Sequence, residues 1–101
     1  MASRLKLHET LCEILGSRHV YYQPPASVQM QYPAIIYSLD DLYTDHADDS
    51  KYRMIHRYQV TLIDKNPESE FIDKIVALPY CDYDRRYTAD NLNHDTFTIY
   101  Y

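Results

Sequence analysis

Residues 51–62, KYRMIHRYQVTL, alternate between two kinds of side chain, and this alternation decides the fold. One set of alternate residues is mostly apolar: Tyr52, Met54, His56, Tyr58, Val60 and Leu62. The set between them is mostly polar: Lys51, Arg53, Ile55, Arg57, Gln59 and Thr61. A period of two predicts a β-strand with one buried face and one face toward water. The segment YPAIIYSLDD, residues 32–41, alternates in the same way. Together the two segments predict a long antiparallel hairpin.

The apolar faces suggest a register for this hairpin. The pairs that bring the two faces together are Ile35 with Val60, Tyr37 with Tyr58, and Leu39 with His56. In this register Tyr43 faces Tyr52, and residues 44–50 form the loop. Asp40 is then expected to lie diagonally near Arg53 and Arg57 on the exposed face.

Helices are predicted on both sides of the hairpin. Ser3 is a cap for a helix over Arg4–Leu15, with Gly16 in the left-handed position that ends it. The segment HVYYQPP, residues 19–25, predicts a short strand that the prolines end. A second helix is expected to follow Asn66 as its cap, with Pro67 at the first helical position. Its predicted buried residues are Phe71, Ile72, Ile75, Val76 and Leu78, and Pro79 ends it.

Two more strands are predicted at the end of the sequence. In the first, Tyr83, Arg85 and Tyr87 are expected to share a face. In the second, Phe97, Ile99 and Tyr101 are expected to share a face, and TADNLNHD, residues 88–95, forms the turn between the strands. The fold class is therefore α+β, with residues 1–101 forming one domain. An antiparallel sheet with a long central hairpin carries two helices on one face.

Composition narrows the function classes. The net charge of −5 disfavours a surface that follows nucleic-acid phosphates. The single glycine argues against phosphate-cradling loops, which need several. The N-terminal residues lack the hydrophobic region of a signal peptide, and no run of 18 apolar residues predicts a membrane span. Cys12 and Cys81 lack metal-finger or redox spacing, so both are expected to be reduced, with Cys12 in the core.

The stretch TDHADDSKY, residues 44–52, is the first candidate site. Asp45, His46, Asp48 and Asp49 could suggest a metal site. A calcium loop, however, needs a glycine at its bend, and this stretch has none. A solvated hairpin tip is the preferred interpretation, with no metal or cofactor.

Other polar residues also have two interpretations. His56 is either a buried histidine bonded to a neighbour or a catalytic base. The pair of His8 and Cys12 is interpreted as packing around an inert thiol, although such a pair could serve a nucleophile. His94 and Asp95 are adjacent in a strand, so they are expected to point to opposite faces.

The segment DYDRRYTAD, residues 82–90, mixes Arg85 and Arg86 with Tyr83 and Tyr87. Such a mixture can bind single-stranded nucleic acid, but the neighbouring aspartates favour a protein interface. The chain has twelve tyrosines, and tyrosine is enriched at protein interfaces. None of these candidates predicts an enzyme.

Three segments together resemble the tail-completion or tail-terminator proteins of long-tailed bacteriophages. They are YPAIIYSLDD, YQVTLIDKNPESEFIDKIVALP and DRRYTADNLNHDTFTIYY, and the resemblance covers residues 32–101. It implies an antiparallel sheet with two helices on one face. It also implies a subunit that assembles with copies of itself into a hexameric ring at the head-proximal end of the tail tube. Such a protein works by assembly rather than by catalysis.

In that role the expected partners are copies of the chain, the tail-tube protein and a neck protein, with DNA passing through the lumen without specific binding. The protein is expected in the virion, and in the host cytoplasm during assembly, without a membrane. The subunit interface is expected to include Tyr83, Arg85, Arg86, Tyr87, Tyr100 and Tyr101. Asp45, His46, Asp48 and Asp49 are expected to face the lumen, where carboxylates repel phosphates. The alternatives are another neck protein, such as a head-closure or connector component, and a small single-stranded nucleic-acid-binding module.

Overall fold

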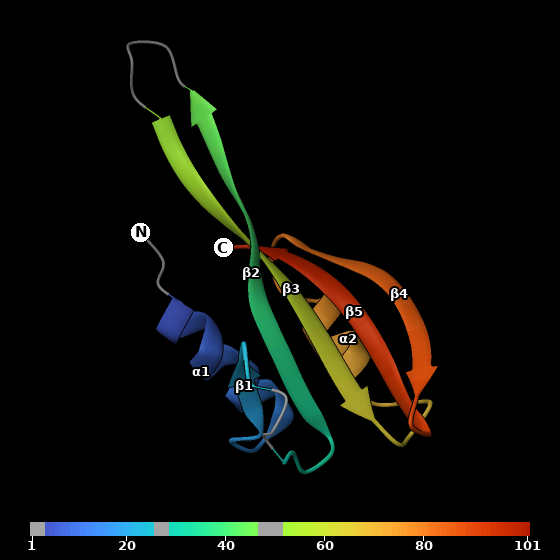
Figure 1. Ribbon diagram of the computed structural model, residues 1–101. Coiled ribbons are helices and arrows are strands. Elements are labelled where there is room, and N and C mark those ends of the chain that lie inside the picture. The colour runs from blue at the N-terminus through green and yellow to red at the C-terminus, as the bar shows by residue number, and fades with distance from the viewer. Residues whose placement is uncertain (1–3, 26–28, 47–51) are drawn as a thin grey trace.

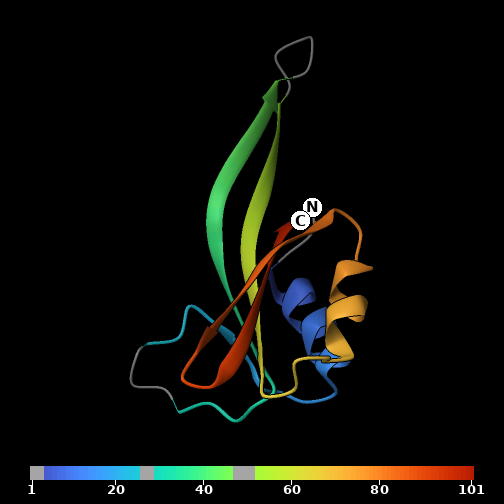
Figure 2. The same cartoon turned by 90° about the vertical axis from the view of Figure 1, so that its right-hand side faces the viewer.

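The structure, a computed structural model, describes residues 4–25, 29–46 and 52–101, with backbone pairing alone for 43–46 and 52–54. The elements are α1 (Arg4–Leu15), β1 (Val20–Tyr22), β2 (Ala34–His46), β3 (Tyr52–Asp64), α2 (Phe71–Val76), β4 (Cys81–Ala89) and β5 (Leu92–Tyr100). The five strands form one sheet in the order β1-β2-β3-β5-β4. Both helices lie on the same face of this sheet, as Figure 2 shows. The α+β fold class is confirmed.

The sheet is mixed, which corrects the prediction of a purely antiparallel one. Strand β1 runs parallel to β2, with Val20 opposite Ile35 and Tyr22 opposite Tyr37. The other three strand pairs are antiparallel. Two parallel neighbours begin at the same end of the sheet, so the connection between them must be long enough to bring the chain back to that end. Residues 23–33 provide that connection, which alternation within the strands could not reveal.

The hairpin of β2 and β3 forms as predicted, but its register differs by two residues. Ile35 pairs with Leu62, Tyr37 with Val60, and Leu39 with Tyr58. A bulge between Leu39 and Asp41 then shifts the register again. The strands continue to the pair His46 with Tyr52, so they extend into the segment expected to be loop.

The core lies between the sheet and the two helices. Leu7, Leu11, Ile35, Val60, Leu62, Ile75 and Phe97 are each 1% exposed or less. Helix α1 spans the predicted residues Arg4–Leu15, while its predicted cap, Ser3, lies outside the described residues. Gly16 follows the helix with a φ of 74°. The Gly16 amide donates to the Cys12 carbonyl at 2.9 Å, so glycine provides the left-handed end that other residues adopt at a cost.

Helix α2 is shorter than expected because it begins at Phe71 rather than Pro67. The Asn66 side chain accepts a hydrogen bond from the Glu68 amide at 3.0 Å, which forms a local turn before the helix. Ile75 is fully buried, but Val76 is 38% exposed, so the prediction that Val76 is buried is wrong. Six residues allow fewer helical positions to face the sheet than the longer predicted helix did.

The last two strands form a tight hairpin. Ala89 pairs with Leu92, so the turn contains only Asp90 and Asn91, with φ of 54° and 62°. Positive φ at both positions is the geometry of the two-residue type I′ turn, which asparagine and aspartate tolerate. The predicted eight-residue turn is therefore wrong in length. Phe97 and Ile99 are buried on the helix side, as expected.

Candidate assembly surface

The outer part of the β2–β3 hairpin projects from the sheet as a two-stranded ribbon (Figure 1). Strand β5 pairs with β3 from Asp64 only as far as Arg57, and β1 pairs with β2 only at residues 35–37. Residues 42–46 and 52–56, here called the ribbon, pair strand to strand only with each other among the described residues. An isolated two-stranded hairpin is at best marginally stable in water, so the ribbon gains stability if a partner covers it.

Charged residues mark the junction between the ribbon and the sheet. Arg57 Nε lies 2.9 Å from Asp40 Oδ2, and its Nη2 lies 3.7 Å from Asp41 Oδ2. The expected proximity of Asp40 and Arg57 is confirmed, while the Arg53 side chain lies outside the described part of the chain. Because Asp40 sits in the bulge and Asp41 directly opposite Arg57, both carboxylates reach the same guanidinium.

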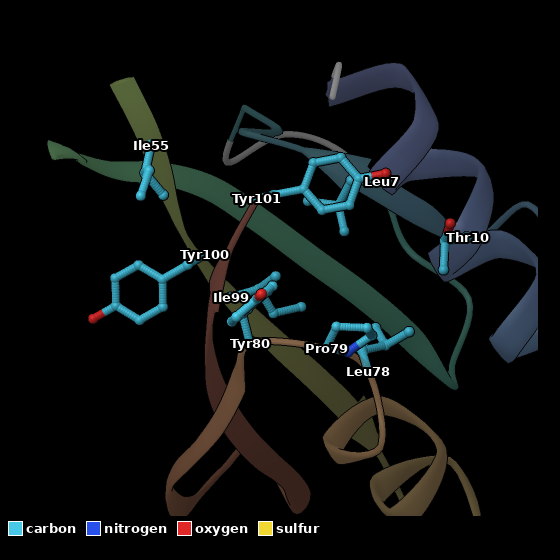
Figure 3. Close-up of a pocket in the computed structure, with 9 residues that line it drawn as sticks. All are labelled: Leu7, Thr10, Ile55, Leu78, Pro79, Tyr80, Ile99, Tyr100 and Tyr101. Atoms are coloured by element: carbon cyan, nitrogen blue, oxygen red, sulfur yellow. The ribbon is translucent and has the colours of Figure 1, made fainter. Parts of the chain in front are cut away.

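An apolar hollow of about 570 Å³ lies on the helix-bearing face at the base of the ribbon. It is lined by residues from α1, from β3, from the α2–β4 connection and from the end of the chain: Leu7, Thr10, Ile55, Leu78, Pro79, Tyr80, Ile99, Tyr100 and Tyr101. Figure 3 shows Tyr101 pointing toward Leu7 of α1, whereas Tyr100 points the opposite way. The end of β5 therefore contributes one tyrosine to each face.

A second hollow of about 660 Å³ lies at the same end of the sheet, on the opposite face. It is lined by Asp41, Ile55, Arg57, Tyr80, Asp82 and Tyr100, and it shares Ile55, Tyr80 and Tyr100 with the apolar hollow. Arg57, Asp82 and Tyr100 belong to the strand positions that point away from the helices, since their neighbours Tyr58 and Ile99 point into the core. The two hollows therefore meet around the edge marked by Tyr80.

Tyr80 is the most exposed of the large hydrophobic residues described, at 79%. Its φ is 57°, a left-handed conformation that is rare for a bulky side chain. Its carbonyl accepts a hydrogen bond from the Tyr100 amide at 3.0 Å, which fixes the turn into β4. The sequence interpretation missed Tyr80 because it treated Pro79 only as a helix stop; the signal was a tyrosine placed directly after that stop.

The predicted interface residues of β4 do not share one face. A bulge between Tyr83 and Arg85 reverses the alternation, so Tyr83 and Arg86 turn toward Asp95, and Arg85 and Tyr87 lie on the other face. The prediction that Tyr83, Arg85 and Tyr87 share a face is therefore wrong. A single stacking surface for nucleic acid would need these aromatic rings together, and the bulge separates them.

Asp95 is the centre of the polar cluster on the helix-bearing face. It is 1% exposed, and Arg86 donates to both of its oxygens, at 2.8 and 3.0 Å. The Tyr83 hydroxyl also donates to Asp95, at 2.7 Å, and this hydrogen bond, followed by burial, raises the pKa of Tyr83. Arg86 is therefore paired within the chain, and this ion pair links the edge strand β4 to β5.

On the other face, Tyr87 stacks on His94 with ring centroids 4.7 Å apart, and the Arg85 guanidinium lies 5.4 Å from the Tyr87 ring. His94 and Asp95 thus point to opposite faces, as expected. His56 is half-buried and stacks on Tyr58 with centroids 6.2 Å apart. Neither histidine is joined to Asp95 in a single site.

A hydrogen-bonded cluster joins α1 to the centre of the sheet. The Tyr37 hydroxyl, on a side chain only 1% exposed, lies 2.7 Å from His8 Nδ1 and accepts from Arg4 Nη1 at 3.2 Å. Burial, and then the charges of Arg4 and Arg18, lower the pKa of His8. His8 therefore bonds to Tyr37 rather than activating Cys12.

Both cysteines are free thiols, as expected. Cys12 is buried against the sheet, and burial raises the pKa of its thiol. Burial, with a smaller contribution from Asp82, raises the pKa of Cys81 to about 11. Thiols with raised pKa values remain protonated near neutral pH, which makes them poor nucleophiles and poor metal ligands.

The acidic stretch is only partly described. Asp45 and His46 lie at the end of β2, opposite Arg53 and Tyr52, and Asp48 and Asp49 lie outside the described residues. Over residues 4–25, 29–46 and 52–101, no group of three or more histidine, cysteine, aspartate or glutamate side chains could hold a metal ion. Within the same ranges, the helices are too short and too polar to cross a bilayer.

Neither a known protein family nor any curated protein matches the sequence.

Proposed function

We propose that the chain is a structural virion protein, a tail-terminator subunit of a long-tailed bacteriophage. In this proposal, six copies form a ring on the head-proximal end of the tail tube. The ring ends tube polymerisation and offers a surface to the neck of the filled head. The proposal rests on the resemblance of residues 32–101 to that family and on the form of the hairpin.

The ribbon is the observation that supports an assembly role most directly. It extends a molecule of 51 × 26 × 23 Å along its longest direction, as Figure 1 shows. Leu42 on the ribbon is 47% exposed, and Leu39 at its base is 38% exposed. A neighbouring subunit that packed on the ribbon would bury these side chains and provide the second layer that a two-stranded hairpin needs.

A closed ring also requires two different surfaces on each subunit, because each copy contacts its two neighbours differently. The ribbon provides one such surface, reaching away from the body of the subunit. The body, with the exposed Tyr83 and Tyr87 on β4, provides the other. A projecting arm and a compact body fit such a head-to-tail arrangement.

Removing the ribbon tests the proposal. In the shortened variant, residues 43–55 are replaced by Asn-Gly, so that Leu42 and His56, which are directly paired, flank a two-residue turn. We expect the body to stay folded, since its core residues lie outside the ribbon. Electron microscopy of the concentrated full-length protein, alone and with tail tubes, should show six-fold rings that cap tube ends, and the shortened variant should form none.

The control is a double substitution in the other tight turn, Asp90→Asn with Asn91→Gly. This change keeps the positive φ at both turn positions and leaves the ribbon intact. It should retain ring formation. Rings that form without the ribbon would contradict its role as the subunit contact, and rings that bind the portal instead of tube ends would identify a different neck component.

A further inference from the structure

Tyr80 combines three features that folding alone does not require. Its side chain is 79% exposed, its backbone has a φ of 57°, and it stands where two hollows on opposite faces of the sheet meet. A bulky residue in the left-handed region destabilises the folded chain relative to glycine at the same place. Strain of this kind, held by surrounding structure, is concentrated at binding and switching sites.

The two hollows differ in chemistry. The hollow on the helix-bearing face offers Leu7, Leu78, Pro79 and Ile99, which suit a large apolar side chain. The hollow on the opposite face offers Asp41 and Asp82, and Arg57 is the one cation among the described residues that line it. Arg57 also pairs with Asp40, so one guanidinium is shared by the carboxylates of Asp40 and Asp41. Asp82 lines the same hollow, and these three carboxylates outnumber the one cation.

We propose that Tyr80 and the two hollows bind an extended segment of a protein other than a copy of this chain. Neighbouring side chains of an extended segment point to opposite sides, so one can enter each hollow. An apolar side chain fills the hollow beside Leu7, and an adjacent lysine or arginine meets Asp41 and Asp82. The Tyr80 ring packs on the segment between them, as exposed aromatic anchors do at interfaces.

Charge favours a different protein over a second copy. Each copy carries a net charge of −5, so a copy approaching this acidic hollow is repelled, whereas a basic segment is attracted. The site adds a partner to the proposed ring, and its test uses the single chain, in which both hollows are already formed.

Peptide binding tests this proposal. The probes are three nine-residue peptides in which leucine alternates with lysine, leucine with glutamate, or serine with lysine. Backbone amide signals of the isotopically labelled protein are followed by NMR during each titration. We expect the leucine–lysine peptide to shift signals at Ile55, Tyr80 and Tyr100, and to bind roughly tenfold more tightly than either other peptide.

Tyr80→Gly separates binding from folding. Glycine adopts a positive φ readily, so this variant should melt at the same temperature or a few degrees higher, by about 4–8 °C at most. It should nevertheless lose roughly tenfold in affinity for the leucine–lysine peptide. Asp82→Asn, at an exposed position, should lower the affinity for the same peptide and leave the melting temperature unchanged.

Gln23→Gly is the matched control, because Gln23 also has a positive φ, 45°, but lies at the end of β1 away from the hollows. It should leave peptide binding unchanged. The proposal is overturned if all three peptides bind equally, if the shifted signals lie elsewhere, or if Tyr80→Gly binds as tightly as the original chain. Ring formation is measured separately by electron microscopy, so the peptide titration can still be interpreted if no rings form.

Discussion

The two halves of the β2–β3 hairpin belong to the same two strands, yet they have opposite environments. In the inner half, Ile35, Tyr37, Val60 and Leu62 are each 1% exposed or less. In the outer half, Leu42 is 47% exposed although it lies on the same face of the hairpin as the buried residues. The inner half is covered by α1 and flanked by β1 and β5, whereas the ribbon extends beyond all three (Figure 1).

This contrast shows that alternation specifies a strand without specifying what covers it. Both halves alternate, but within the part of the chain that the structure describes, only the inner half has neighbouring strands on its edges and a helix on its face. The boundary lies where β5 ends, because Arg57 pairs with Tyr100 and the Tyr101 amide donates to the His56 carbonyl. Beyond that point, no other strand of the described residues pairs with the ribbon.

The largest expected difference between the two halves is in the free energy of unfolding that is lost when one leucine in each half is truncated to alanine. Leu62→Ala, at a fully buried site, should reduce the free energy of unfolding by about 2–5 kcal/mol, because it leaves a cavity. Leu42→Ala, in the ribbon, should change it by less than about 0.5 kcal/mol. Urea unfolding of the two variants measures both values. Equal losses would mean that the ribbon is already packed within a single subunit.

The general architecture was predictable from local patterns. The α1 boundaries, the left-handed Gly16, the hairpin and the buried faces of β3 and β5 follow from periodicity and end signals. The register was not predictable in the same way. A shift of two residues keeps every side chain on its own face, so pairing Ile35 with Val60 or with Leu62 satisfies the alternation equally well.

The candidate site was less predictable because it depends on irregularities. Each of the two bulges, at Asp40 and at Asp84, adds one residue that breaks the alternation, so the faces assigned to Arg85 and Tyr83 could not both be right. Tyr80 required knowledge of its backbone conformation, which propensity does not give. The parallel placement of β1 likewise depends on how a long connection returns through space.

Acidic pH should weaken the hydrogen bond between His8 of α1 and Tyr37, which joins the inner half of the hairpin to this helix. Arg4 donates to the Tyr37 hydroxyl, and His8 Nδ1 lies 2.7 Å from the same hydroxyl. Burial and the nearby arginines lower the pKa of His8 below its usual value of 6.5. The unfolded chain therefore takes up a proton more readily than the folded chain as the pH falls.

The resulting stability is fully present above the unfolded pKa of about 6.5 and is lost as the pH falls through and below it. We expect the urea midpoint to fall between about pH 7 and pH 5, and His8→Gln to flatten this slope. His19→Gln, which changes a histidine outside the cluster, is the control. An identical slope in the His8 variant would show that protonation of His8 is not coupled to unfolding.

The smallest effect on stability is expected at the boundary between the ribbon and the inner half, where Arg57 pairs with Asp40 and Asp41. The side chains of Arg57, Asp40 and Asp41 are 36%, 40% and 60% exposed, so water and salt screen their ion pairs. Arg57→Gln should therefore shift the melting temperature by less than about 2 °C, and added salt should reduce the shift further. Differential scanning calorimetry at low and high salt measures both effects. A larger, salt-independent loss would mean that the ion pairs hold the ribbon to the sheet. A small one supports the view that strand neighbours and helix cover, rather than charge, decide where the stable body ends.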